Sequence, residues 1–104
     1  MASEYTEQIS QRRHAQAVRA ALTMAGHTAY ERGKTQPGRP AFLTFVHVGG
    51  GVTVSLHVAE VSDAYRVVKL AEYRAALTAT GFTVEQRADY LYVHPEGGTG
   101  GKAE

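Results

Sequence analysis

The chain has 104 residues, of which 43% are hydrophobic and 20% are charged, and it contains no cysteine. This length leaves room for one domain with its own core, and the composition argues against a disordered chain. Without cysteine the protein has no disulfide bond, no thiolate nucleophile and no cysteine-ligated zinc.

Both ends of the sequence differ in composition from its centre. Residues 1–9 form a polar segment without the basic and then apolar layout of a signal peptide, and residues 96–104 contain four glycines, which is typical of a flexible tail. We therefore assign one folded domain to residues 10–95. No apolar run is long enough to span a bilayer, so we expect a cytoplasmic protein without a membrane partner. The excess of arginine over lysine, eight to three, indicates a GC-rich bacterial genome.

Two helices are predicted from the spacing of apolar residues and from signals at the helix ends. The first runs from about Ser10, or from near Thr6, to Ala25, with Gly26 placed to adopt the left-handed conformation after the last turn. The second begins after Ser62, a good N-cap residue, and is closed by Gly81. Its buried stripe is expected to consist of Val67, Leu70, Tyr73 and Leu77.

An internal similarity links the two predicted helix ends. Residues 19–28 match residues 74–83 at a constant offset of 55, with seven of the ten positions identical. The shared unit consists of a helix, a glycine cap and a strand. Because a strand is predicted after the second copy, we also expect a short strand from His27 to Arg32.

Alternating β-branched residues predict a first hairpin. It consists of residues 42–48 and 52–58, joined by three glycines. A three-residue loop places Val48 opposite Val52, and the apolar residues of both strands then share one face.

A second hairpin is predicted from residues 82–87 and 90–94, with Val84 opposite Val93. The predicted order of elements is therefore α-β-β-β-α-β-β. The simplest architecture for this order is an α+β fold, in which one antiparallel sheet carries both helices on one of its faces.

The other face of the sheet is expected to be rich in aromatic and histidine side chains. Its candidate interface residues are Tyr30, Leu43, Phe45, His47, His57, Tyr90 and Tyr92, with Thr53, Ser55, Arg87 and His94 between them. Large apolar patches usually mark an interface, which favours a homodimer or another protein partner. The same side chains suit stacking on nucleic-acid bases, and this alternative stays open.

Positive charge is concentrated in residues 10–39. This segment holds six Arg or Lys residues against Glu31, a sum of +5 within a chain of net charge +1. The candidate contacts to the phosphates of a nucleic-acid partner are Arg12, Arg13, Arg19, Lys34 and Arg39. A solvated helix face followed by a polar loop accounts for the same charges, so both interpretations stand.

We find no sequence signature of catalysis, of a metal site or of a cofactor. The sequence has no Gly-x-Ser-x-Gly turn and no carboxylates paired as acid and base. The predicted register separates His47 from His57 by ~14 Å, which is too far for coordination of one metal ion. We therefore expect a protein that is not an enzyme and that uses neither metal nor cofactor.

The leading interpretation is a small binding module that self-associates, or docks a protein partner, through the open sheet face. The first alternative is a nucleic-acid-binding accessory protein that uses the basic segment 12–39. The second is an enzyme or small-molecule binder with a pocket of Tyr and His side chains.

Overall fold

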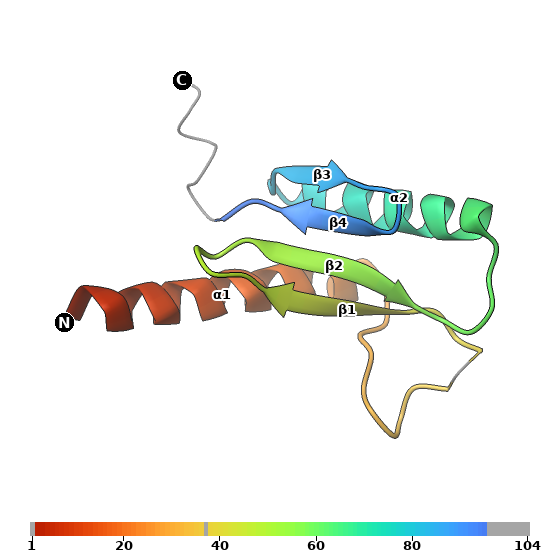
Figure 1. Ribbon diagram of the computed structural model, residues 1–104, viewed down its shortest axis with the longest axis horizontal. Helices are drawn as coiled ribbons and strands as arrows, with labels where there is room; N and C mark the ends of the chain where they lie inside the picture. Colours follow the sequence, from red (N-terminus) through yellow and green to blue (C-terminus); the bar gives the residue numbers. More distant parts are fainter. Residues whose placement is uncertain (1, 37, 96–104) are drawn as a thin grey trace.

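The computed structural model describes residues 2–36 and 38–95, and it shows an α+β fold with two helices and one four-stranded antiparallel sheet (Figure 1). The elements in chain order are α1 (Ala2–Met24), β1 (Ala41–Val46), β2 (Val52–His57), α2 (Asp63–Ala79), β3 (Val84–Gln86) and β4 (Tyr90–Val93). The strands lie in the order β1-β2-β4-β3. The predicted fold class is therefore confirmed, whereas the predicted tail, residues 96–104, lies outside the described residues.

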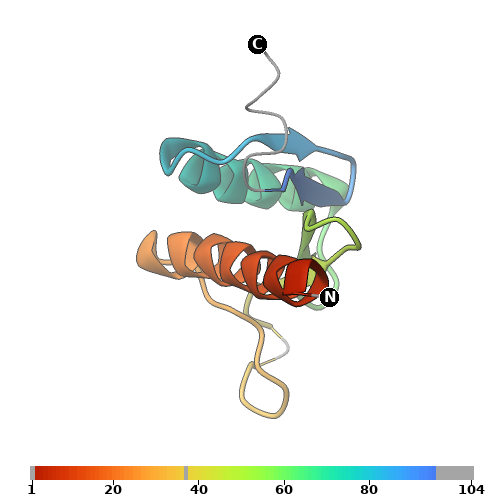
Figure 2. The ribbon, with the colours of Figure 1, turned by 90° about the vertical axis from the view of Figure 1, so that its left-hand side faces the viewer.

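Both helices pack against the same face of the sheet, as predicted (Figures 1 and 2). The buried core consists of Val18 and Leu22 of α1, Leu70, Tyr73 and Leu77 of α2, and Phe42, Val52, Val54, Leu56, Leu91 and Val93 of the strands. Val67 does not belong to this core, contrary to the prediction, and is 47% exposed. It lies three residues before the buried Leu70, beside Val68, which is also exposed.

The first helix ends where the sequence predicted. Gly26 adopts a positive φ of 96°, and its N–H donates to the carbonyl of Thr23 at 3.0 Å. The N–H of His27 donates to the carbonyl of Leu22, also at 3.0 Å. These two bonds form a Schellman cap, which satisfies carbonyl groups that the end of a helix leaves without partners.

The second helix ends in the same way at an offset of 55 residues. Gly81 has a φ of 104°, and the N–H of Phe82 donates to the carbonyl of Leu77 at 3.1 Å. The two similar segments, residues 19–28 and 74–83, thus share one cap geometry, while their origin as an internal repeat stays a prediction.

The helix starts agree with the prediction in one case only. The side chain of Ser62 accepts a hydrogen bond from the N–H of Tyr65 at 3.0 Å, as an N-cap residue does. The helix α1, in contrast, begins at Ala2, before both predicted starts, Thr6 and Ser10. Residues 2–9 contain neither proline nor glycine, so the helix can extend through them although they lack an apolar stripe.

The predicted register of the first hairpin is wrong by two residues. Val46 lies opposite Val52, and His47 and Gly51 close the loop through an N–H to carbonyl bond of 2.8 Å. A shift of two residues keeps every side chain on its predicted face. It does, however, move Val46 and Val48 to the end of the hairpin, where they are exposed instead of buried. The register of the second hairpin, with Val84 opposite Val93, is confirmed.

The predicted strand from His27 to Arg32 is not formed. The segment touches β1 at one point, a parallel bridge between Ala29 and Phe42. The N–H of Phe42 donates to the carbonyl of Thr28, and the N–H of Tyr30 donates to the carbonyl of Phe42, both at 2.9 Å. The observed order is α-β-β-α-β-β, because the chain leaves the sheet edge after this bridge and returns as β1.

The glycine caps lead to a stability prediction. An alanine Cβ at Gly26 would meet no atom within 4 Å, so Gly26→Ala should cost only the strain of the left-handed backbone, about 1 kcal/mol of the free energy of unfolding. Gly38→Ala is the matched control, since Gly38 also has open space around it but no positive φ. Chemical denaturation of both variants measures the difference, and equal stabilities would contradict the role of Gly26 in the cap.

Candidate functional site

The face of the sheet opposite the helices carries the side chains that the sequence assigned to it. One row crosses all four strands, because Phe45 pairs with Thr53, Thr53 with Tyr92, and Tyr92 with Glu85. A second row runs through Leu43, Ser55 and Tyr90. No described helix covers this outer face, and Phe45 is 54% exposed and Tyr90 37% exposed.

Two predicted members of the outer face lie at the margin of the sheet. Tyr30 belongs to the segment beside β1, and its ring centroid lies 4.2 Å from that of His57. His57 pairs with the buried Ala41, so the two rings meet over a small side chain. His47 follows the end of β1, and its ring bonds to the hydroxyl of Thr53.

Tyr92 is the most firmly held aromatic residue of the outer face. Its ring lies over the backbone of Gly51, where any Cβ would overlap with the tyrosine side chain. The ring centroids of His94 and His47 lie 5.0 Å and 6.0 Å from that of Tyr92. The position of the Tyr92 ring therefore requires a glycine at residue 51. From the sequence, Gly51 was predicted only to be part of the hairpin loop.

The charges of the outer face are neutralised within it. Glu85 is the only Asp, Glu, Lys or Arg in the four strands. One of its oxygens pairs with Arg87, and the other lies 2.6 Å from the Nε2 of His94. The face therefore presents aromatic rings and hydroxyl groups without an excess of either charge.

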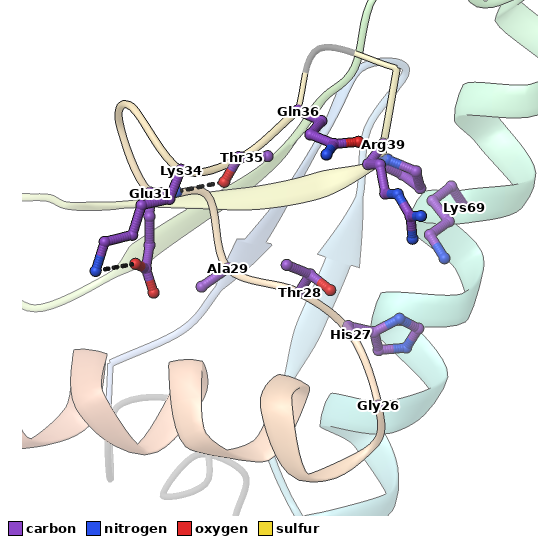
Figure 3. Close-up of a pocket in the computed structure, with 11 residues that line it drawn as sticks. Gly26, His27, Thr28, Ala29, Glu31, Lys34, Thr35, Gln36, Arg39 and Lys69 are labelled. Carbon is purple, nitrogen blue, oxygen red and sulfur yellow. Dashed lines mark hydrogen bonds and ion pairs between the residues drawn. The ribbon is translucent and has the colours of Figure 1, made fainter.

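The predicted basic segment is divided by the fold. Arg12, Arg13 and Arg19 are exposed on α1. Lys34 and Arg39 instead line a cleft of about 570 Å³ between the loop after α1 and the helix α2 (Figure 3). The five candidate nucleic-acid contacts are thus divided between α1, which carries three of them, and the cleft, which two of them line.

The opposite wall of the cleft contributes Lys69, which the sequence analysis did not single out. Lys69 pairs with Glu72 at 3.2 Å, and Lys34 pairs with Glu31 at 3.5 Å. Arg39 has no carboxylate within ion-pair distance among the described residues. In Figure 3 the ends of the Arg39 and Lys69 side chains turn toward one another.

His27 and Tyr73 lie next to this cleft and the core. Their rings meet edge to face, with centroids 4.7 Å apart. Burial, reinforced by the positive charge of Lys69 and opposed by Glu72, lowers the pKa of His27. Burial also raises the pKa of Tyr73, so its phenol stays neutral at physiological pH. The Tyr73 hydroxyl has no hydrogen-bond partner among the described residues.

Two further properties of the structure and the comparison with known proteins bear on the candidate sites. Within residues 2–36 and 38–95, no three His, Asp or Glu side chains come close enough to hold one metal ion. Neither described helix combines the length and the apolar character that crossing a bilayer requires. The chain matches no family model, no curated protein and no solved structure.

The unpartnered hydroxyl leads to a second stability prediction. Tyr73→Phe should raise the free energy of unfolding by about 1 kcal/mol, because it removes a buried polar group that has no hydrogen bond. Tyr65→Phe on the same helix is the control and should change little, since Tyr65 is exposed. Thermal and urea denaturation measure both. A destabilised Tyr73→Phe would mean that the hydroxyl has a partner in solution.

The lowered pKa of His27 leads to a pH prediction. The unfolded chain, with a His27 pKa near the ordinary 6.5, binds more protons than the folded chain below that pH. His27 therefore does not reduce the free energy of unfolding above the ordinary pKa. It reduces it progressively as the pH falls from the ordinary pKa toward the lowered pKa of the folded protein. His27→Gln should flatten the loss of stability measured between about pH 7.5 and about pH 5.5, and identical slopes in both proteins would contradict it.

Proposed function

We propose that the protein is a binding module that forms a homodimer through the outer face of its sheet. The observation that carries this proposal is a sheet face without a described helix over it and without excess charge, on which Leu43 and Phe45 of β1 and Tyr90 and Tyr92 of β4 flank the hydroxyl side chains of β2. Isolated exposed apolar residues are ordinary, but several of them on one open face favour association.

A second copy of the chain is the occupant that the charges favour. In a twofold interface each surface meets itself, so an excess of one charge would repel its own copy. Here Glu85 is paired with Arg87 and His94, and the remaining side chains of the face are neutral at pH 7 when His is neutral. Such a face can approach its own copy without like-charge repulsion.

The same pairing disfavours a nucleic acid on this face. Phosphate contacts require cations that are free to release their counterions. Arg87 is the arginine predicted for this face, and it already pairs with Glu85. The aromatic side chains alone would offer stacking without the electrostatic attraction that usually accompanies it.

The size of the face indicates a weak affinity. Four strands at a spacing of about 4.8 Å and up to six residues at about 3.4 Å give a face of roughly 19 Å by 20 Å, or about 380 Å². This area is below the ~800 Å² per partner that a complex of standard size buries. We expect a weak dimer in the upper micromolar range, with two sheets packed face to face and the helices outside.

The test is Phe45→Glu, which places a charge at the most exposed aromatic position of the face. Burial of an unpaired charge is costly, so the variant should be a folded monomer with near-normal circular dichroism. Val68→Glu is the matched control, because Val68 is 57% exposed on α2 and Phe45 54% exposed on β1. Sedimentation across the micromolar range should show a dimer for the control and half that mass for Phe45→Glu.

Two results would overturn the proposal. One is a wild-type protein that stays monomeric at every concentration, and the other is dissociation by Val68→Glu but not by Phe45→Glu. If Phe45→Glu fails to fold, Tyr90→Glu tests the same face from β4. Tyr92 is a poorer choice, since its ring packs over Gly51 and its loss would disturb the loop.

A further inference from the structure

We propose that the cleft between residues 26–36 and 38–40 on one side and α2 on the other binds a small phosphorylated molecule, which Arg39 and Lys69 hold between them. This site lies apart from the outer face of the sheet and goes beyond the proposed dimerisation. A volume of about 570 Å³ is typical of sites for small molecules.

The described part of the cleft is built in advance of any ligand. The N–H of Glu31 donates to the hydroxyl of Thr35 at 2.7 Å, and the N–H of Lys34 donates to the carbonyl of Glu31 at 3.0 Å. The N–H of Arg39 donates to the carbonyl of Gln36, also at 3.0 Å. At one end the loop is fixed to β1 by its bonds with Phe42. A ligand would therefore lose little affinity to ordering of this wall.

The charges of the cleft call for an anion. Its lining includes the cations Lys34, Arg39 and Lys69. Lys34 pairs with Glu31 and Lys69 with Glu72, whereas Arg39 has no carboxylate within ion-pair distance among the described residues. Figure 3 shows Arg39 and Lys69 turned toward one another from opposite walls. An anion between them is attracted by both cations, and its attraction to Arg39 meets no competing carboxylate among the described residues.

The residue types favour phosphate over a carboxylate-bearing ligand. Arginine offers a planar fork that binds two phosphate oxygens at once, and lysine adds a compact point charge. The Thr28 hydroxyl lines the same cleft and can donate to a further oxygen. A phosphate group has enough oxygens to use all three donors.

The arrangement favours a small molecule over a nucleic-acid strand. Only Arg39 and Lys69 turn toward the same hollow, whereas a strand needs a succession of phosphate contacts along a groove. Arg12, Arg13 and Arg19 do not belong to the lining of the cleft and lie on α1. The site therefore accommodates one phosphate or a diphosphate, with the remaining volume for an organic part.

The experiment titrates the full chain with pyrophosphate and with ADP in a buffer without phosphate or sulfate. Calorimetry gives the affinity, and amide shifts in NMR spectra locate the site. Arg39→Gln should weaken binding by about tenfold or more, because it removes a charge-assisted contact. Arg12→Gln removes the same charge outside the cleft and should leave the affinity within about twofold. Since Arg39 is exposed, its replacement should not impair folding.

The two probes distinguish a site that recognises phosphate alone from a site that recognises a nucleotide-like ligand. Equal affinities for both probes with shifts at His27 and Thr28 support recognition of phosphate alone, and tighter binding of ADP supports a nucleotide-like ligand. Lys69→Gln provides an independent test from the other wall and should also weaken binding. The proposal is overturned if neither probe binds at millimolar concentration, or if Arg12→Gln weakens binding as much as Arg39→Gln. Tighter binding of an oligonucleotide with equal dependence on Arg12 and Arg39 would also overturn it, in favour of a nucleic-acid partner.

Discussion

The alternation of side chains along four strands divides the sheet between a core and an outer face. In β2, Val52, Val54 and Leu56 are buried under the helices, and the residues between them point to the other side. Each strand residue belongs to one of these faces, because successive side chains in a strand point in opposite directions. The core and the proposed dimer surface therefore depend on the same constraint.

This constraint explains why the faces could be predicted from the sequence although the register of the first hairpin could not. The three glycines indicated a short loop, but the observed loop begins at His47 and includes it with Val48. An error of two residues preserves the face of every side chain, whereas an error of one would have reversed it. Only burial at the hairpin end was affected, where Val46 of the edge strand β1 is exposed.

In the rest of the chain, features that depend on neighbouring residues could be predicted from the sequence, whereas features that depend on residues far apart in the sequence could not. Gly26 and Gly81 marked the helix ends, because a left-handed cap depends on a few neighbouring residues. The start of α1 at Ala2 was missed, since residues 2–9 show no apolar periodicity in the sequence. The cleft was missed because Lys69 and Arg39 are far apart in the sequence, and a net charge over residues 10–39 cannot show which cations converge.

The single bridge at Ala29 also affects how copies of this chain can meet. Sheet edges with free backbone groups invite strand addition and, through it, open-ended aggregation. At the β1 edge both backbone groups of Phe42 are occupied by Thr28 and Tyr30, and the opposite edge strand, β3, is only three residues long. These bonds and the short β3 limit the edge length that is open to strand addition. In the proposed dimer, by contrast, twofold contact through the broad face closes on itself and stops at two.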